Sequence, residues 1–139
     1  MVYICKYECQ EAVDYWLATA KSDLETAEVI FRAGKNYDHC LFFCHLVLEK
    51  GLKALVVKKT QKIPPKIHNL LLLADMSGAL VDDAQKDFFR LMNGFNIEGR
   101  YPDEQYEIYM KATKRYTMNL LAKTKEQFGW MGKLALRLE

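Results

Sequence analysis

The sequence predicts an all-α fold, an up-and-down antiparallel bundle of four long helices plus a short one. Apolar residues recur at steps of three and four positions through most of the chain, which is the spacing of a buried helical stripe. The 139 residues include seven glycines and three prolines, few enough for long helices to form. Residues 41–57 are apolar at twelve of seventeen positions, which is typical of a helix covered on several sides.

The bundle is expected to form around this apolar segment, in a helix that runs from Tyr37 to about Lys58. Polar and charged side chains interrupt the apolar run, namely His45, Glu49, Lys50 and Lys53. They leave no stretch of about 18 apolar residues, the length that a membrane span needs. We therefore expect the central helix of a bundle and no contact with a membrane.

The first helix is predicted for residues 11–33, after a short extended or frayed leader at residues 1–10. Its apolar residues alternate steps of four and three, the pattern of a helix packed along a partner: Val13, Leu17, Ala20, Leu24, Ala27 and Phe31. Gly34 is expected to end this helix, and Asn36 or Asp38 to cap the next. A connection this short makes the two helices antiparallel neighbours.

A loop and a short helix are predicted next. Pro64 and Pro65 prevent a regular helix from continuing through residues 60–66. A leucine-rich helix is then expected over residues 68–74, closed by residues 76–78.

The last third of the chain is predicted to hold two helices. Residues 82–93 have helical apolar spacing and begin with two acids, which suit a helix N-terminus. A loop follows at residues 93–103, and a fifth helix is expected from about residue 103 to Phe128. Gly129 and Gly132 are predicted to break it. We expect one domain over residues 1–139, with its core at 11–128 and an amphipathic tail at 129–139.

The overall charge gives little information on partners, but its distribution gives more. A net charge of +2 does not by itself indicate nucleic-acid binding. Residues 50–66 contain six lysines and no acid, whereas residues 82–107 are mainly acidic and 111–139 mainly basic. These segments form either a polar surface or one that faces a partner; the lysines could line a groove for RNA. The start of the chain lacks the apolar core of a signal peptide, so we expect a cytoplasmic protein with reduced thiols.

Four segments resemble one known family. They are Trp16 through Ala27, the run Glu49-Lys50-Gly51-Leu52-Lys53-Ala54-Leu55 after Tyr37-Asp38, Lys66-Ile67-His68-Asn69-Leu70, and Gly99-Arg100-Tyr101-Pro102-Asp103. Their order and spacing over roughly residues 11–128 resemble the HEPN domain (higher eukaryotes and prokaryotes nucleotide-binding). The resemblance implies a helical bundle that dimerises and that works with nucleotides or RNA. It also implies pairing with a minimal nucleotidyltransferase, as in a toxin–antitoxin-like system.

The chain departs from the family's ribonuclease motif. The resemblance implies that active members are metal-independent ribonucleases. Their motif is an arginine followed four to six residues later by a histidine. In this sequence no histidine follows Arg90, Arg100 or Arg115 at that spacing. Histidine is the residue best suited to exchange a proton near neutral pH, so activity of the family's usual kind is not expected.

Residues 96–103 form the predicted ligand-binding loop. Arg100 can bind a phosphate through two parallel hydrogen bonds, Tyr101 can stack on a base, and Asn96 can bind a base edge. Asp103 is included in this candidate site. The structural alternative is that Arg100 pairs with Asp103, that Pro102 begins the helix and that Tyr101 packs.

Lys53 and His68 complete the set of candidate ligand-binding residues. Lys53 could face phosphates, or it could belong with Glu49 and Lys50 to a solvated stripe of charges. His68 could donate a proton near Arg100, or it could cap or pack at the start of the short helix.

We expect no metal site and no cofactor. Cys5, Cys9, Cys40 and Cys44, with His39 and His45, include ligand types that zinc uses. Their spacing is unsuitable, however, because His39 and His45 point away from the line that joins Cys40 to Cys44 on a helix.

Three functions are consistent with these residues. The first is a homodimeric, HEPN-like nucleotide- or RNA-binding protein, the partner of a minimal nucleotidyltransferase. The second is a metal-independent endoribonuclease in which His68 replaces the missing histidine beside Arg100. The third is a structural helper whose loop shapes a dimer interface.

Overall fold

The computed structural model describes residues 6–137 and contains six helices in that range. They are α1 (Lys6–Ala33), α2 (Tyr37–Thr60), α3 (Leu70–Ser77), α4 (Asp83–Asn93), α5 (Pro102–Lys111) and α6 (Lys114–Leu136). The predicted all-α bundle is confirmed. Within residues 6–137, no helix combines the length and the hydropathy that a transmembrane span requires.

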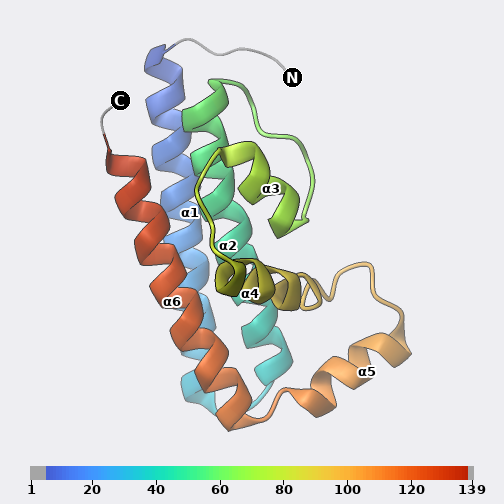
Figure 1. The fold of residues 1–139 in the computed structure, drawn as a ribbon. Coiled ribbons are helices and arrows are strands. Elements are labelled where there is room, and N and C mark those ends of the chain that lie inside the picture. The colour runs from blue at the N-terminus through green and yellow to red at the C-terminus, as the bar shows by residue number, and fades with distance from the viewer. Residues whose placement is uncertain (1–5, 138–139) are drawn as a thin grey trace.

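Helix α2 lies at the centre of the fold (Figure 1). The long helices α1 and α6 pack along it, with α1 antiparallel and α6 parallel to it, while the short helices α3 and α4 cover a further side. Fourteen residues of α2 are buried, including all of those from Val47 to Val57 except Lys50. The predicted apolar central helix is therefore correct.

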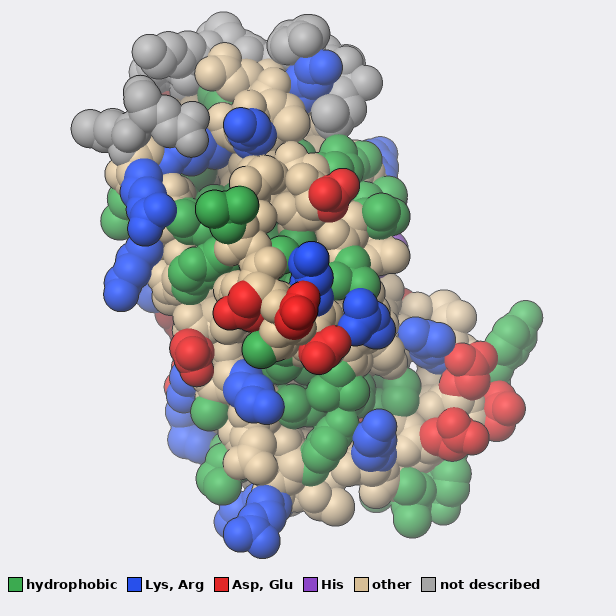
Figure 2. All heavy atoms as spheres, viewed as in Figure 1, with side chains coloured by type: hydrophobic (Ala, Val, Ile, Leu, Met, Phe, Trp, Pro, Cys, Tyr) green, Lys and Arg blue, Asp and Glu red, His purple; other side chains and the backbone are tan. Residues whose placement is uncertain are grey.

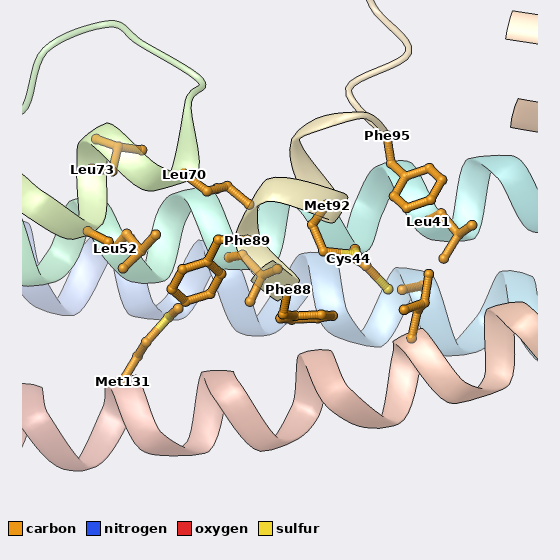
Figure 3. Packing of buried hydrophobic residues seen from close by; sticks show 14 of the residues in the cluster. Leu41, Cys44, Leu52, Leu70, Leu73, Phe88, Phe89, Met92, Phe95 and Met131 are labelled. Carbon is orange, nitrogen blue, oxygen red and sulfur yellow. The ribbon is translucent and has the colours of Figure 1, made fainter. Parts of the chain in front are cut away.

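The main core lies between α2, α6 and the two short helices. Figure 3 shows Phe88 and Phe89 of α4 pointing into the space between α2 and α6, with Met131 of α6 directed toward Phe89. Phe89 and Met131 are fully buried, and Phe88 nearly so. Because α4 is only 11 residues long, this row of large side chains is what fixes it across the two long helices.

Two helix ends follow from the residues that the sequence singled out. Helix α1 ends at Ala33, and Gly34 takes a left-handed conformation with φ +76° that glycine adopts without strain. Helix α4 begins with a capping box, in which the Asp82 side chain accepts from the Gln85 amide (2.7 Å) and Gln85 accepts from the Asp82 amide (3.0 Å).

Two helix starts differ from the prediction. Helix α1 already includes residues 6–10, which were expected to be a leader; residues 1–5 lie outside the described part of the chain. Helix α3 begins at Leu70 rather than at His68, because the Asn69 side chain accepts from the amides of Leu71 (3.0 Å) and Leu72 (3.4 Å) and so supplies the N-cap.

The predicted fifth helix is two helices. The chain leaves helical geometry at Ala112, whose ψ is 69°, and resumes it after Thr113, whose hydroxyl accepts from the Tyr116 amide (3.3 Å). Threonine is a good N-cap, and no glycine or proline marks the break. The hydrophobic spacing alone therefore predicted one helix where the structure has two, α5 and α6.

Helix α5 projects from the body of the bundle (Figure 1). None of its residues is buried, although Ile108 packs against the core. Acidic and hydrophobic side chains gather on it in Figure 2, and Tyr106, Tyr109 and Met110 are exposed. Of the six described helices, α5 is therefore the one without a buried residue.

The predicted break at Gly129 and Gly132 is wrong, because α6 continues to Leu136. Each glycine costs a helix about 1 kcal/mol relative to alanine. Burial of Met131 between the two glycines offsets that cost. The sulfur of Met131 packs on Gly51 of α2, where an added Cβ would lie 2.5 Å from Sδ.

Gly51→Ala is expected to lower the free energy of unfolding by about 1 kcal/mol or more. Overpacking typically costs about 1–3 kcal/mol, which outweighs the helix preference of alanine. Gly129→Ala is the matched control, since an added Cβ there meets nothing within 4 Å and should raise stability slightly. Urea denaturation measures both. Equal stabilisation by the two substitutions would show that Met131 does not need the space over Gly51.

Candidate functional site

A polar hollow of about 380 Å³ lies where three segments meet. These segments are the start of α3, the end of α4, and the loop 94–101 with the first turn of α5. The side chains that line it and that matter here are His68, Asn69, Asn93, Asn96, Arg100 and Glu104. Residues from three separate stretches of sequence therefore share one surface.

Two asparagines hold the first two segments together. The Leu70 amide donates to Asn93 Oδ1 (2.8 Å), and Asn93 Nδ2 donates to Asn69 Oδ1 (3.1 Å). Asn69 also caps α3, so one side chain both starts that helix and contacts the end of α4. The base of the hollow is thus fixed by hydrogen bonds between neutral groups.

Arg100 is tethered on both sides of the hollow. Its Nη1 donates to Glu104 Oε2 (3.3 Å) and its Nη2 to the Asn93 carbonyl (3.4 Å). Gly99 has φ +83°, which lets the chain turn sharply just before the arginine. The side chain of Arg100 is 37% exposed, so a ligand can reach the guanidinium.

The purely structural interpretation of the loop before α5, which the sequence left open, is partly wrong. Pro102 does begin α5. Arg100, however, pairs with Glu104 in the first turn of α5 rather than with Asp103. Tyr101 does not pack, since it is 73% exposed. Tyr101 and Asp103 adjoin the hollow in sequence but do not line it.

His68 is held by a buried carboxylate. Its Nδ1 lies 2.9 Å from Glu49 Oε1, and Lys53 Nζ donates to Glu49 Oε2 (3.0 Å). The side chain of His68 is 64% exposed, whereas those of Glu49 and Lys53 are 6% and 7% exposed. The predicted solvated stripe is therefore wrong for Glu49 and Lys53, because α3 and α1 cover that side of α2.

Lys53 occupies a different place from the other candidate residues. Its ammonium bonds Glu49 and lies 5.4 Å from the centre of the Trp16 ring, a cation–π distance. It does not line the hollow. Of the predicted ligand-binding residues, the fold brings His68, Asn96 and Arg100 to the hollow, and connects Lys53 to it through Glu49.

His45 lies below His68, one turn before Glu49 on α2. Its Nε2 lies 3.1 Å from the His68 carbonyl, which can only accept, so Nε2 carries the proton. Burial lowers the pKa of His45 below its ordinary 6.5, although Glu49 acts in the opposite direction. The neutral imidazole is therefore the form that the fold accommodates.

The basic segment is largely used for structure rather than for a groove. Lys50 pairs with Asp23 of α1 (2.6 Å), and Lys58 donates to the carbonyls of Leu134 and Ala135 (2.9 Å each) and to that of Arg137 at the end of α6. Cations suit the negative end of a helix. With Lys53 on Glu49, at least three of the six lysines have partners within the fold.

The cysteines of α2 behave as core residues. Cys40 and Cys44 are fully buried, and the Cys40 thiol donates to the Ala27 carbonyl (3.3 Å). A hydrogen bond between the two thiols lowers the pKa of Cys40 and raises that of Cys44, which burial raises further. Over residues 6–137, no group of three or more His, Cys, Asp or Glu side chains has a geometry that could hold a metal ion.

The arrangement can bind a ligand that carries both an anion and hydrogen-bonding edges. Arg100 offers a planar cation for a phosphate, Asn96 offers an amide, and His68 offers an imidazole. The carboxylates of Glu98 and Glu104 accept from donors such as amino groups. A nucleotide has all of these groups.

The family comparison agrees with the fold. A HEPN domain model matches residues 13–134, which is most of the chain. The chain belongs to the HEPN domain family. Membership gives this HEPN protein a function related to nucleotides or RNA at the level of the family. No curated protein and no solved structure matches the sequence significantly.

Three residues that shape or support the hollow are not predicted from the sequence as site residues. They are Glu49, which the sequence places on a solvated face, and Asn69 and Asn93. Asn93 stands at a helix end before a glycine, and Asn69 stands directly before a leucine run, both of which are capping signals. Nothing in the sequence shows that the two amides, 24 residues apart, contact each other.

Stability is expected to fall as the pH drops below about 6.5, in part because of His45. The unfolded state binds a proton at its ordinary pKa, while the folded state binds it only at lower pH, so the unfolded state gains protons first. The slope reaches about 1.4 kcal/mol per pH unit for one such group. Urea denaturation between pH 5 and 8 should show a shallower pH dependence for His45→Gln than for the wild type. Parallel curves for the two proteins would contradict this assignment.

Proposed function

We propose that this HEPN protein binds a nucleotide, or the nucleotides of an RNA, in the hollow that contains His68, Asn96 and Arg100. One observation carries the proposal: side chains from separate segments, each able to contact a nucleotide, gather at one exposed polar surface. Arg100 binds a phosphate, Asn96 a base edge, and Tyr101 stacks on a base from its exposed position beside the hollow. Asp103 stays in the candidate site as a neighbour in the first turn of α5.

The state of Arg100 supports this role. Its partner Glu104 is 42% exposed, and both of its hydrogen bonds are long, at 3.3 and 3.4 Å. An exposed pair of this kind contributes little to stability, so a phosphate can replace the carboxylate at small cost. The guanidinium would then keep its bond to the Asn93 carbonyl while its other edge faces the ligand.

The proposal includes a protein partner and a cellular compartment. The exposed hydrophobic side chains of α5 and of Leu136 support dimerisation and pairing with a minimal nucleotidyltransferase in a toxin–antitoxin-like system. The reduced state of Cys40 and Cys44 supports a cytoplasmic location.

Arg100→Gln is expected to weaken nucleotide binding about tenfold or more, since hydrogen bonds to charged groups contribute roughly 1.5–3 kcal/mol. Calorimetric titration with ribonucleoside mono-, di- and triphosphates and with short RNA measures the effect. Arg90→Gln is the matched control, because Arg90 also forms an exposed pair, with Asp87 at 2.7 Å, but does not line the hollow. No heat with any of these ligands, or equal losses in both variants, would refute the proposal.

A second candidate function is a metal-independent endoribonuclease, and the position of His68 favours it. His68 and Arg100 come from segments about thirty residues apart, yet they line the same hollow, as the family's paired arginine and histidine would require. In such a reaction the ribose 2′-hydroxyl gives its proton to His68 and its oxygen attacks the phosphorus. The bond to the 5′-oxygen breaks, that oxygen takes a proton from water, and a 2′,3′-cyclic phosphate remains. Arg100 offsets the added negative charge on the phosphate.

His68→Gln is expected to abolish cleavage of total RNA by this activity, with a loss of about 100-fold or more, because a general base contributes roughly that much. Gel analysis of RNA incubated with chelator present measures it, and His39→Gln should cleave as the wild type does. If wild type and both variants leave the RNA intact, the protein is a binding protein rather than a nuclease.

A further inference from the structure

We propose that Glu49 is a positioning residue that fixes His68 in the tautomer with its proton on Nδ1, so that Nε2 carries the lone pair. The inference rests on the proposed function of the hollow and adds a residue that does not line it. In this inference Lys53 binds the Glu49 carboxylate and does not contact the ligand.

The charge state of Glu49 follows from its surroundings. Its side chain is 6% exposed, and a carboxylate in such a position needs a cation or several donors. Lys53 Nζ supplies the cation at Oε2 (3.0 Å), and it is as buried as its partner. The second oxygen, Oε1, is left for His68 (2.9 Å). The buried lysine thus keeps a carboxylate beneath an exposed imidazole.

The tautomer of His68 follows from this contact. A carboxylate has acceptors alone, so the ring nitrogen that meets it must carry a hydrogen. That nitrogen is Nδ1. In the neutral imidazole the lone pair therefore lies on Nε2, for which the described residues provide no hydrogen-bond partner. Nε2 is free to accept from a ligand donor, and the ribose hydroxyl of a nucleotide is a donor of that kind.

The main chain of His68 is held as well as its ring. His45 donates from Nε2 to the His68 carbonyl (3.1 Å), which leaves its own Nδ1 without a partner 4.0 Å from Glu49 Oε1. Because this Nδ1 carries no proton, Glu49 Oε1 accepts from His68 and not from His45, so the two histidines do not compete for that oxygen. Helix α2 fixes the carbonyl and the imidazole of His68 from positions one helical turn apart.

The charged and titratable groups around His68 belong to two parts of the chain. Glu49, Lys53 and His45 approach it from α2, and Glu98, Arg100 and Glu104 line the same hollow. Of the α2 groups, Glu49 contacts Nδ1 directly and Lys53 acts through Glu49, whereas a bound ligand would meet Nε2. Glu49 therefore sets the tautomer through its contact with His68 Nδ1, and it does not need to touch the ligand.

The first test is nuclear magnetic resonance of the intact protein labelled with ¹⁵N-histidine. At about pH 8.5, above the ordinary titration range of histidine, ring-nitrogen shifts distinguish protonated from unprotonated nitrogen. His68→Gln assigns the signal. The expected result is a proton on Nδ1 of His68 in the wild type, and a proton on Nε2 in the wild type would overturn the inference without any change to Glu49.

The second test changes the carboxylate. Glu49→Leu removes the acceptor that faces His68 Nδ1 but leaves Lys53 buried without its partner, so the double variant Glu49→Leu with Lys53→Met keeps the site neutral, and circular dichroism checks its fold. We expect its His68 signal to shift toward the Nε2-protonated form. The control is Asp23→Asn. It removes the α1 carboxylate that pairs with Lys50 of α2 and should leave the tautomer unchanged. An unchanged tautomer in the folded double variant would refute the role of Glu49.

The third test separates this inference from the proposed function. Affinity for the nucleotide that binds the wild type should fall about tenfold in the double variant and not in Asp23→Asn, a loss of about 1.4 kcal/mol. If the wild type binds no nucleotide, the proposed function fails, while the resonance measurement still decides the tautomer. If the tautomer shifts but affinity does not, Glu49 is not a positioning residue for that ligand.

Discussion

The fold depends on the burial of helix α2. A helix that is apolar around most of its circumference cannot be covered by one neighbour, so α1 and α6 pack along it and two short helices cover a further side. Because short helices cover that side of α2, several loops and helix ends lie on it. Polar groups at those ends need partners, and Asn69 and Asn93 provide them for each other. The hollow is thus a product of how the central helix is covered.

Three polar residues lie along one face of α2, and the neighbouring segments that cover α2 bury them. His45, Glu49 and Lys53 follow one another at four-residue steps, so they form a line along the helix. The line is buried under the segment that leads into α3, where an apolar row would have packed with less desolvation cost. Its contacts converge on His68, the one member of this group whose side chain is mostly exposed. A buried ionic line that ends at an exposed imidazole is better suited to holding a reactive or binding group than to stabilising the bundle.

The fold class and several helix ends could be predicted from the sequence because they depend on local signals. Gly34 and Asp82 act within a turn of their own positions, and the apolar spacing of α1 and α2 is regular. The break at Ala112 was missed because Thr113 is a weak signal inside a helical pattern, and Gly129 was overrated because burial of Met131 nearby is a tertiary effect. For the site, Asn96, Arg100 and His68 could be chosen by residue type, but their meeting depends on contacts between distant segments. Glu49 and Lys53 were misplaced because a charged residue on a helix is exposed far more often than it is buried.

The weak packing of α5 has a consequence for access to the hollow. A ten-residue helix without a buried residue has little intrinsic stability, and its separation from the bundle would remove the contact of Ile108 with the core. Glu104 belongs to α5 and Asn93 to α4, so Arg100 links the packed body of the bundle to a helix that has no buried residue. Amide hydrogen exchange would then run fast through residues 94–111 and slowly through α2. One wall of the hollow can thus be rebuilt around a bound molecule while the His68 side keeps its shape.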